Sequence, residues 1–396
     1  MADLKQLTGQ FLTLFGGEVE GIRYYQAPGR VNLIGEHTDY NGGYVFPAAL
    51  TFGTTLLLRP RGDRVLRFAS TNFPHKQGEV LLDGIEYREE DDWVNYPKGV
   101  VNELQISGRG PAQGYDLLYH GEIPNGSGLS SSASIEVLTG YALLSEGGHP
   151  IDRTELALLA QKSENEFNGV QCGIMDQFAV ANGRRDQAML LMCDTLEFRH
   201  VPFESEEYVL VIGNTNKRRG LVDSKYNERR SECDQAVEEL KEAYPELTLL
   251  GQLTPEQFHT EAGRIESMTV RRRALHVVEE IDRVLQSVSV LEKGDLHTFG
   301  QLMNDSHDSL RDLYEVTGKE LDAMVDAARK VPGVLGSRMT GAGFGGCTVS
   351  LVHKDSVDRF REEVAAQYTG VTGLVPDFYV CSIGDGASQL DAPIQA

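Results

Sequence analysis

The chain has 396 residues, of which 40% are hydrophobic, and carries a formal net charge of −22 at pH 7. A chain of this length exceeds the usual size of a single hydrophobic core, so we expect two packed domains. The acidic balance excludes the extended basic surface that nucleic acid or an anionic membrane requires, so we expect neither as a partner.

The cysteine pattern and the absence of long apolar stretches indicate the cellular setting. Five scattered cysteines without C-x-x-C spacing are typical of reduced thiols rather than of a disulfide or zinc framework. The N-terminus has an early acid and no long apolar stretch, and no later stretch reaches the length of a membrane span. We therefore expect a cytoplasmic protein without a membrane partner. We also expect a monomer.

The first half of the chain is rich in predicted strands. Residues 54–58 and 65–68 have strand composition and are joined through turn-forming residues 61–63. Residues 115–119 form a further predicted strand that leads into a glycine- and serine-rich segment. Apolar positions then recur at helical spacing, which predicts an amphipathic helix over residues 155–167 that carries Glu164.

The second half is predicted to be α+β. A strand at 209–212 precedes charged helices, and strands return near the end of the chain. We place the domain boundary near residue 205, which gives an N-terminal domain of residues 1–205 and a C-terminal domain of residues 206–396. The helices are expected at residues 226–244, 270–291, 296–314 and 318–330, and the late strands at residues 347–352 and 378–381.

The segment from residue 124 to residue 134 is predicted to bind phosphate. It reads Pro-Asn-Gly-Ser-Gly-Leu-Ser-Ser-Ser-Ala-Ser and runs directly into an apolar stretch, which places backbone N–H groups and a helix N-terminus at one point. A Walker A loop needs a Lys-Ser or Lys-Thr pair where this chain has Leu129, Ser130 and Ser131, so this is not a P-loop. The alternative is a flexible surface turn.

A second glycine-rich segment, residues 341–346, formally contains G-x-G-x-x-G. A dinucleotide-binding fingerprint opens a helix, whereas residues 347–352 are predicted to form a strand. The sequence context therefore excludes a Rossmann site.

The serines that open the predicted helix could also hold a metal ion. Ser130, Ser131 and Ser132 present three hydroxyl groups, and hydroxyl oxygens are suitable Mg²⁺ ligands. Because Mg²⁺ takes one or two protein oxygens together with phosphates and water, Ser132 with a carboxylate such as Glu164 would suffice.

The segment from residue 29 to residue 40 is dense in mixed donors and acceptors: Arg30, Asn32, Glu36, His37 and Asp39. Each hydroxyl group of a sugar both donates and accepts, so such a segment suits a polyhydroxylated ligand. A metal site is the rival, but the segment lacks H-E-x-x-H or a spaced second histidine. His37 by itself could equally cap a turn.

Asp176 is an acid among apolar residues. Buried carboxylates are uncommon unless they are paired, and a partner such as Arg30 would stabilise the ionised form while leaving it ready to accept a proton. The alternative is an aspartate that caps a helix. The sequence leaves both interpretations open.

Taken together, these segments resemble the galactokinase family, within the superfamily of galactokinases, homoserine kinases, mevalonate kinases and phosphomevalonate kinases. Residues 29–43 resemble the galactokinase signature throughout, and the two glycine-rich segments match the other two superfamily motifs in order. Residues 173–177 and 224–230 extend the resemblance across nearly the whole chain, with no departure at a motif position.

The resemblance implies the α+β, two-domain fold of small-molecule kinases, with an N-terminal α/β domain, a ferredoxin-like C-terminal domain and the active site between them. It implies that Asp176 is the catalytic base and that Arg30 steadies the transition state. The implied substrate-binding residues are Glu36, His37, Thr38, Asp39, Gly173 and Tyr226.

The resemblance also implies the nucleotide site. Residues 341–346 would support the phosphate loop and the sugar from the other domain. Ser132 and Glu164 would bind Mg²⁺, and Ser70 would touch the nucleotide. The residues implied to wrap the ATP phosphates are Gly126, Ser127, Gly128, Leu129, Ser130, Ser131 and Ser132.

The implied reaction is the transfer of a phosphoryl group from ATP to the anomeric hydroxyl of α-D-galactose, the first committed step of galactose catabolism by the Leloir pathway. Kinases for N-acetylgalactosamine or arabinose are alternatives, because a few side chains around the sugar can exchange substrates. A galactose- and ATP-binding regulator without catalysis is a further alternative. The complete serine-rich loop, residues 129–134, argues against it.

Overall fold

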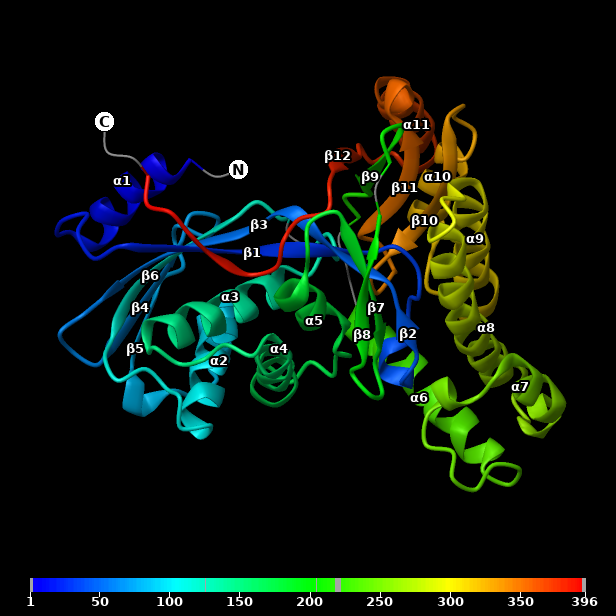
Figure 1. The fold of residues 1–396 in the computed structure, drawn as a ribbon, viewed down its shortest axis with the longest axis horizontal. Helices are drawn as coiled ribbons and strands as arrows, with labels where there is room; N and C mark the ends of the chain where they lie inside the picture. The colour runs from blue at the N-terminus through cyan, green and yellow to red at the C-terminus, as the bar shows by residue number, and fades with distance from the viewer. Residues whose placement is uncertain (1–2, 125, 204, 218–221, 394–396) are drawn as a thin grey trace.

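The computed structural model describes residues 3–124, 126–203, 205–217 and 222–393. The fold is α+β and is built on two main sheets that lie at opposite ends of the molecule, with a small sheet between them (Figure 1). The helices are α1 (Leu4–Phe15), α2 (Asn95–Ile106), α3 (Ser131–Glu146), α4 (Arg153–Lys162), α5 (Met175–Asn182), α6 (Val222–Leu240), α7 (Pro255–Glu261), α8 (Met268–Leu291), α9 (Leu296–Ser309), α10 (Lys319–Ala328) and α11 (Val357–Thr372).

The first sheet has six strands and helices on both faces. Because side chains alternate along a strand, Leu56 and Leu58 pack with α2–α5, whereas Leu57 packs with α1 on the opposite face (Figure 1). In spatial order the strands are β13 (Ser388–Leu390), β1 (Arg23–Asn32), β3 (Pro47–Pro60), β6 (Tyr115–Gly121), β4 (Val65–Ser70) and β5 (Gly78–Leu81).

The two strands predicted on either side of residues 61–63 both form, but they are not neighbours. Strand β6 lies between β3 and β4 and pairs with β4 in parallel. The turn connects the two strands without making them a hairpin, because strand pairing depends on a partner about 50 residues further along the chain.

The second sheet has the ferredoxin-like arrangement expected from the resemblance. Its order is β10 (Val334–Thr340), β11 (Cys347–His353), β9 (Tyr208–Asn214) and β12 (Asp377–Cys381), with antiparallel neighbours throughout. Along the chain these strands and their helices follow the β-α-β-β-α-β order, with several helices in the first crossover and α11 in the second.

One hydrophobic core joins the two sheets. It includes Val31 and Phe46 from the first half of the chain and Val284, Phe299 and Val349 from the second. The small sheet, β2 (Tyr44–Val45), β7 (Gln187–Met192) and β8 (Phe198–Pro202), lies between them. The ends of β1 and β10 meet beside this core, where Asn32 and Thr340 are hydrogen-bonded to each other.

The end of the chain returns to the first sheet. Figure 1 shows the C-terminal segment running back from β12 across β1 and β3, and β13 pairs antiparallel with β1, with Leu390 opposite Tyr24. The sequence analysis did not anticipate this return. The domain boundary near residue 205 stays a prediction.

Two of the predicted helices end in π-helical turns. Helix α4 ends at Lys162 and continues as a π-helical turn over Ser163–Phe167, and α9 continues in the same way over Leu310–Tyr314. In the part of the chain that the structure describes, no helix combines the length and apolar character needed to cross a membrane. All five cysteines are free thiols.

Candidate active site

Three distant segments meet around Asp176. Arg30 donates from Nε and Nη2 to the two carboxylate oxygens of Asp176, at 2.8 Å in each case, and the hydroxyl group of Ser130 donates to Oδ2. The Arg30 side chain is 4% exposed and that of Asp176 is 29% exposed. A bidentate, partly buried pair of this kind fixes the position of the carboxylate through two charge-assisted hydrogen bonds.

Asp176 does not act as a helix cap. It lies in the first turn of α5, whose N-cap residue is Ile174, and its carboxylate points instead to Arg30 and Ser130. The helix-cap alternative is therefore wrong, and the predicted pairing with Arg30 is present.

Arg30 also holds the predicted phosphate loop. Its Nη1 donates to the carbonyl oxygen of Gly128 at 2.6 Å, and its backbone N–H donates to that of Leu129 at 3.2 Å. Gly126 and Gly128 have φ values of 69° and 78°, in the left-handed region that favours glycine. The loop is thus a built structure and not a free surface turn.

The loop leaves its donors available for an anion. Ser130 precedes α3 with a φ of 63°, and its hydroxyl group bonds to Asp176 instead of capping the helix. Among the described residues, the buried hydroxyl group of Ser127 has no hydrogen-bond partner. Uncapped N–H groups at a helix start, together with a spare hydroxyl group, suit a phosphate.

The second glycine-rich segment, residues 341–346, lies against the phosphate loop and the segment of residues 29–40. A Cβ at Gly341 would lie 2.9 Å from the carbonyl oxygen of Gly128, so the loop after β10 touches the phosphate loop. The N–H group of Gly341 donates to Oε1 of Glu36, and the carbonyl oxygen of Ala342 lies 3.2 Å from Nε2 of His37. Residues 341–346 therefore contact the phosphate loop and the segment of residues 29–40, and their support of the sugar stays a prediction.

Glu36 is almost completely buried, at 1% exposed. Its carboxylate accepts hydrogen bonds from the Asn32 amide and from the N–H group of Gly341. Burial raises the pKa of this carboxyl group, and the charges of Arg338 and Arg30 act in the opposite direction.

His37 is a neutral, buried ring in an aromatic cluster. Its Nδ1 lies 2.9 Å from the hydroxyl group of Tyr40. The centroids of the Tyr314 and Tyr226 rings lie 4.8 and 5.6 Å from the centroid of the His37 ring. Burial, and then the charge of His276, lowers the pKa of His37 to about 3. Tyr226 lies on α6, so the second half of the chain supplies part of this aromatic cluster.

Asp39 and Gly173 pack directly against each other. A Cβ at Gly173 would overlap Oδ2 of Asp39. Burial, and then the charge of Asp176, raises the pKa of Asp39 to about 6. Thr38 is buried, and its hydroxyl group lies 2.9 Å from the carbonyl oxygen of Gly35 and 2.7 Å from that of Tyr44, so it holds its own loop together. Its contact with substrate stays a prediction.

We expect Gly173→Ala to weaken sugar binding selectively, because the new methyl group displaces the Asp39 carboxylate. The KM for the sugar should rise by about tenfold or more while that for ATP changes little, since a displacement of about 1 Å at a site is costly. Gly62→Ala is the control, because nothing lies within 4 Å of a Cβ there. Equal effects of both variants in steady-state kinetics would contradict the prediction.

Glu164 lies on the π-helical turn after α4, beside the start of α3. It is buried, hydrogen-bonds to Ser132, and accepts from Nε2 of Gln177 at 2.6 Å. Burial raises the pKa of Glu164. A carboxylate and a hydroxyl group side by side are the oxygen ligands that Mg²⁺ prefers, and a phosphate could complete the shell. The described residues contain no cluster of three or more His, Cys, Asp or Glu suited to a metal.

The sequence analysis did not identify the buried polar residues that contact these site residues. Gln177 also lies 3.4 Å from Glu136, a second fully buried carboxylate, and burial raises the pKa of Glu136 well above its usual range. An acid inside the apolar run 135–138 was the available signal, the same signal that singled out Asp176. Arg338, the one charged residue of the buried strand β10, is a similar case.

Ser70 lies at the end of β4, beside a small pocket next to the phosphate loop. Trp93, Ile123, Ser131 and Ile135 are among the other residues that line it. The hydroxyl group of Ser70 accepts from the N–H group of Asn72 at 3.1 Å. The structure therefore brings Ser70 near the start of α3, and its contact with a nucleotide stays a prediction.

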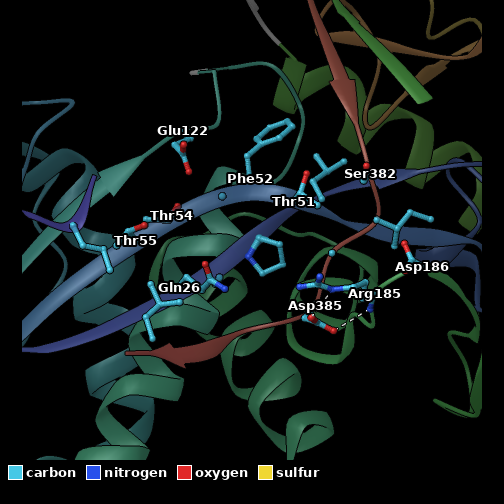
Figure 2. Close-up of a pocket in the computed structure, with 18 residues that line it drawn as sticks. Gln26, Thr51, Phe52, Thr54, Thr55, Glu122, Arg185, Asp186, Ser382 and Asp385 are labelled. Carbon is cyan, nitrogen blue, oxygen red and sulfur yellow. Dashed lines mark hydrogen bonds and ion pairs between the residues drawn. The ribbon is translucent and has the colours of Figure 1, made fainter. Parts of the chain in front are cut away.

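A separate pocket of about 530 Å³ contains none of the predicted site residues. Figure 2 shows it between β1, β3 and the segment that follows β12, with Gln26, Thr51 and Phe52 on the strands. Arg185 and Asp385 form an ion pair at its edge, with a distance of 3.4 Å. The candidate active site is therefore defined by its side-chain geometry and not by this pocket.

Comparisons with known proteins show which family this chain resembles over nearly its whole length. Residues 9–60 match the galactokinase galactose-binding signature, residues 95–184 the N-terminal domain of GHMP kinases, and residues 287–370 their C-terminal domain. The chain is 50% identical to the galactokinase of Bacillus subtilis, over 98% of this chain and 99% of that one, and 49% identical to that of Clostridium beijerinckii, over 98% and 100%. The crystal structure of Lactococcus lactis galactokinase complexed with galactose superposes with a TM-score of 0.95 at 45% identity, and covers 98% of this chain and 100% of that one.

Proposed function

The chain belongs to the galactokinase family and is a sugar kinase, and from that premise we propose that it transfers the γ-phosphoryl group of ATP to the anomeric hydroxyl of α-D-galactose. The observation that carries the proposal is the Arg30–Asp176 pair, with both bonds at 2.8 Å, beside the uncapped start of α3. A carboxylate, a guanidinium and a phosphate cradle then meet at one point, which is what phosphoryl transfer requires.

In the proposed reaction, the anomeric oxygen of galactose forms a bond to the γ-phosphorus while the bond from that phosphorus to the β,γ-bridging oxygen of ATP breaks. The carboxylate of Asp176 accepts the proton of the sugar hydroxyl, and ADP leaves. Because the transition state is loose, alignment and charge neutralisation dominate, and Arg30 supplies positive charge next to the transferring group.

The proposed sugar site uses the buried polar groups on the first segment. Glu36 and Asp39 offer carboxylate oxygens to sugar hydroxyls, and His37, whose ring nitrogens contact Tyr40 and Ala342, offers the face of its neutral ring. Tyr226 closes the site from α6, and Gly173 leaves the room that Asp39 occupies. Thr38 is retained as a proposed substrate-binding residue of the same loop.

The proposed nucleotide site follows the start of α3. The loop from Gly126 to Ser132 wraps the ATP phosphates, with the spare hydroxyl group of Ser127 and the uncapped N–H groups of the helix as donors. The small pocket at Ser70 and Trp93 lies next to Ser131 and is proposed to take the nucleoside.

Mg²⁺ is proposed to bind at Ser132 and Glu164 when the nucleotide is present, and it supplies charge neutralisation of the phosphate oxygens. We expect Glu164→Gln to weaken divalent-ion binding by about tenfold or more, because a neutral amide replaces a carboxylate ligand. Electron paramagnetic resonance of Mn²⁺ with enzyme and ADP measures this directly. Glu166→Gln, an exposed acid on the same turn, is the control. Unchanged Mn²⁺ binding in Glu164→Gln would contradict the proposed ligand.

A coupled ADP-release assay over a panel of monosaccharides, with the phosphorylated carbon identified by NMR, tests the proposed function. We expect galactose to be the best substrate and C1 the phosphorylated position. A preference for N-acetylgalactosamine or arabinose would replace the substrate. Sugar binding without ADP release would support the regulator instead. A monomeric, cytoplasmic enzyme is proposed on the acidic charge and the five free thiols.

A further inference from the structure

Arg338 is a completely buried arginine that links the two sheets. It lies on β10 and is 0% exposed. Its Nη1 donates to the carbonyl oxygen of Asn32, at the end of β1, at 3.0 Å, and its Nε donates to the hydroxyl group of Ser306 at 3.2 Å. Thr340, two residues along β10, also hydrogen-bonds to Asn32. The guanidinium thus reaches from the second sheet into the segment that carries the proposed sugar site.

The guanidinium of Arg338 lies between two buried carboxylates. Its Nη1 is 3.7 Å from Oε1 of Glu36, and its Nη2 is 4.0 Å from Oε1 of Glu280. Glu280 pairs in turn with Arg283 and accepts from the N–H group of Gly35 at 3.0 Å. Positive and negative groups therefore alternate from the sugar segment into α8.

Stability alone does not explain this arrangement. Buried ion pairs are often no more stabilising than well-packed apolar side chains, because removing charges from water is costly. Among the described residues, Nη2 of Arg338 has no hydrogen-bond partner, so its charge is not fully compensated by local bonds. A guanidinium kept at such a cost is best explained by what it does to a neighbouring functional group.

We propose that Arg338 is a positioning residue for the sugar, which acts by holding the Glu36 carboxylate charged and fixed across the interface between the two sheets. The proposal rests on the proposed function of Glu36 as a sugar ligand. It adds a residue from β10 to that site without placing it in contact with substrate.

The charges around Glu36 give the proposal a pH signature. Burial raises the pKa of Glu36, and Arg338 is the largest opposing cause, ahead of Arg30 on β1. The other titratable groups that face Glu36 are Asp39 on its own loop, His276 and Glu280 on α8, and His37 beside it. Their pKa values are shifted to about 6 or below, so none of them titrates between pH 7 and 9.

Removing Arg338 should therefore move the titration of Glu36 upward. In Arg338→Met we expect the pKa of Glu36 to rise further, because burial is then opposed by one positive charge fewer, so that a larger part of the enzyme carries a protonated, neutral Glu36. Raising the pH restores the carboxylate, and sugar binding should recover between pH 7 and 9.

The experiment measures galactose binding by isothermal titration calorimetry, and kcat and KM by ADP release, at pH 7, 8 and 9. At pH 7, Arg338→Met should raise the Kd and KM for galactose by about tenfold or more, since one pKa unit corresponds to a tenfold change, while the KM for ATP changes by less than about threefold. Arg338→Lys, which keeps the charge, should recover part of the affinity. In Arg338→Met combined with Glu36→Gln, the recovery at pH 9 should disappear.

Arg273→Met is the matched control. Arg273 is also a buried arginine on the second half of the chain, but it pairs with Glu232 and Glu315, away from Glu36. Near-ultraviolet circular dichroism establishes that each variant is folded. If Arg338→Met does not fold, Arg338→Gln, which also removes the charge, supplies the same test through its rise in galactose Kd at pH 7 and its recovery at higher pH.

Two outcomes are distinguishable. If the wild-type chain neither binds nor phosphorylates galactose, the proposed function fails. If the wild type phosphorylates galactose and the Arg338 variants bind it normally, or bind it weakly at every pH, the positioning role of Arg338 is overturned and the proposed function stands.

Discussion

Asp176→Asn lowers kcat by about 10²–10⁴-fold, the usual contribution of a general base, and leaves the Kd for galactose within about tenfold. The amide keeps the size of the side chain and can still accept from Arg30 at one oxygen, but it cannot take the proton of the sugar hydroxyl. Single-turnover kinetics with saturating ATP separates this chemical step from product release.

Asp83→Asn is the control for the Asp176 prediction. Asp83 accepts hydrogen bonds from Nε and Nη2 of Arg64, which is the same kind of pair as Arg30–Asp176, but it lies on the surface. We expect this variant to keep wild-type turnover. Near-native turnover of Asp176→Asn would show that another group accepts the proton, and Asp39, whose pKa is raised to about 6, would be the next group to test.

Arg30→Ala is expected to lower kcat by about 10²–10³-fold, the range seen when one preorganised electrostatic group is removed, and to change the ATP affinity much less. Two effects combine in this variant. The transferring phosphoryl group loses its neighbouring positive charge, and the phosphate loop loses the bond from Nη1 to the carbonyl oxygen of Gly128.

Stability has to be measured beside the activity of Arg30→Ala. Removing one partner of a partly buried pair leaves the Asp176 carboxylate uncompensated, so the free energy of unfolding should fall as well. Arg64→Ala removes the equivalent partner of the exposed pair and should affect neither property appreciably. If Arg30→Ala only raised the KM for ATP and left kcat unchanged, its role would be nucleotide binding and not catalysis.

The sequence predicted the elements that depend on local pattern. The helix of residues 270–291 appears as α8, with its first turn at Met268, and the strand of residues 347–352 appears as β11. Long periodic segments can be predicted because each turn of an amphipathic helix repeats the same spacing of apolar residues. The three glycine- and polar-rich segments were found for a similar reason, since their residue types are unusual for any packed element.

The sequence did not predict elements whose partners lie far away. Strand β13 pairs with β1, which lies almost the whole chain away in sequence, and β6 lies between β3 and β4. The residue pattern within β13 or β6 does not indicate which strand it pairs with. The π-helical turn that carries Glu164 was read as ordinary helix, because one extra residue in a turn does not change composition.

Residue chemistry alone therefore predicted which groups take part: a phosphate cradle at residues 124–134, a sugar-type polar segment, and an unusual acid at Asp176. Tertiary structure decided how those groups are paired. It resolved Asp176 as a partner of Arg30 rather than a helix cap, and it placed Gln177 beside Glu164 and Arg338 beside Glu36. The physical reason is that burial and ion pairing depend on atoms brought together from β1, α3, α5 and β10, and no local window of sequence contains those distances.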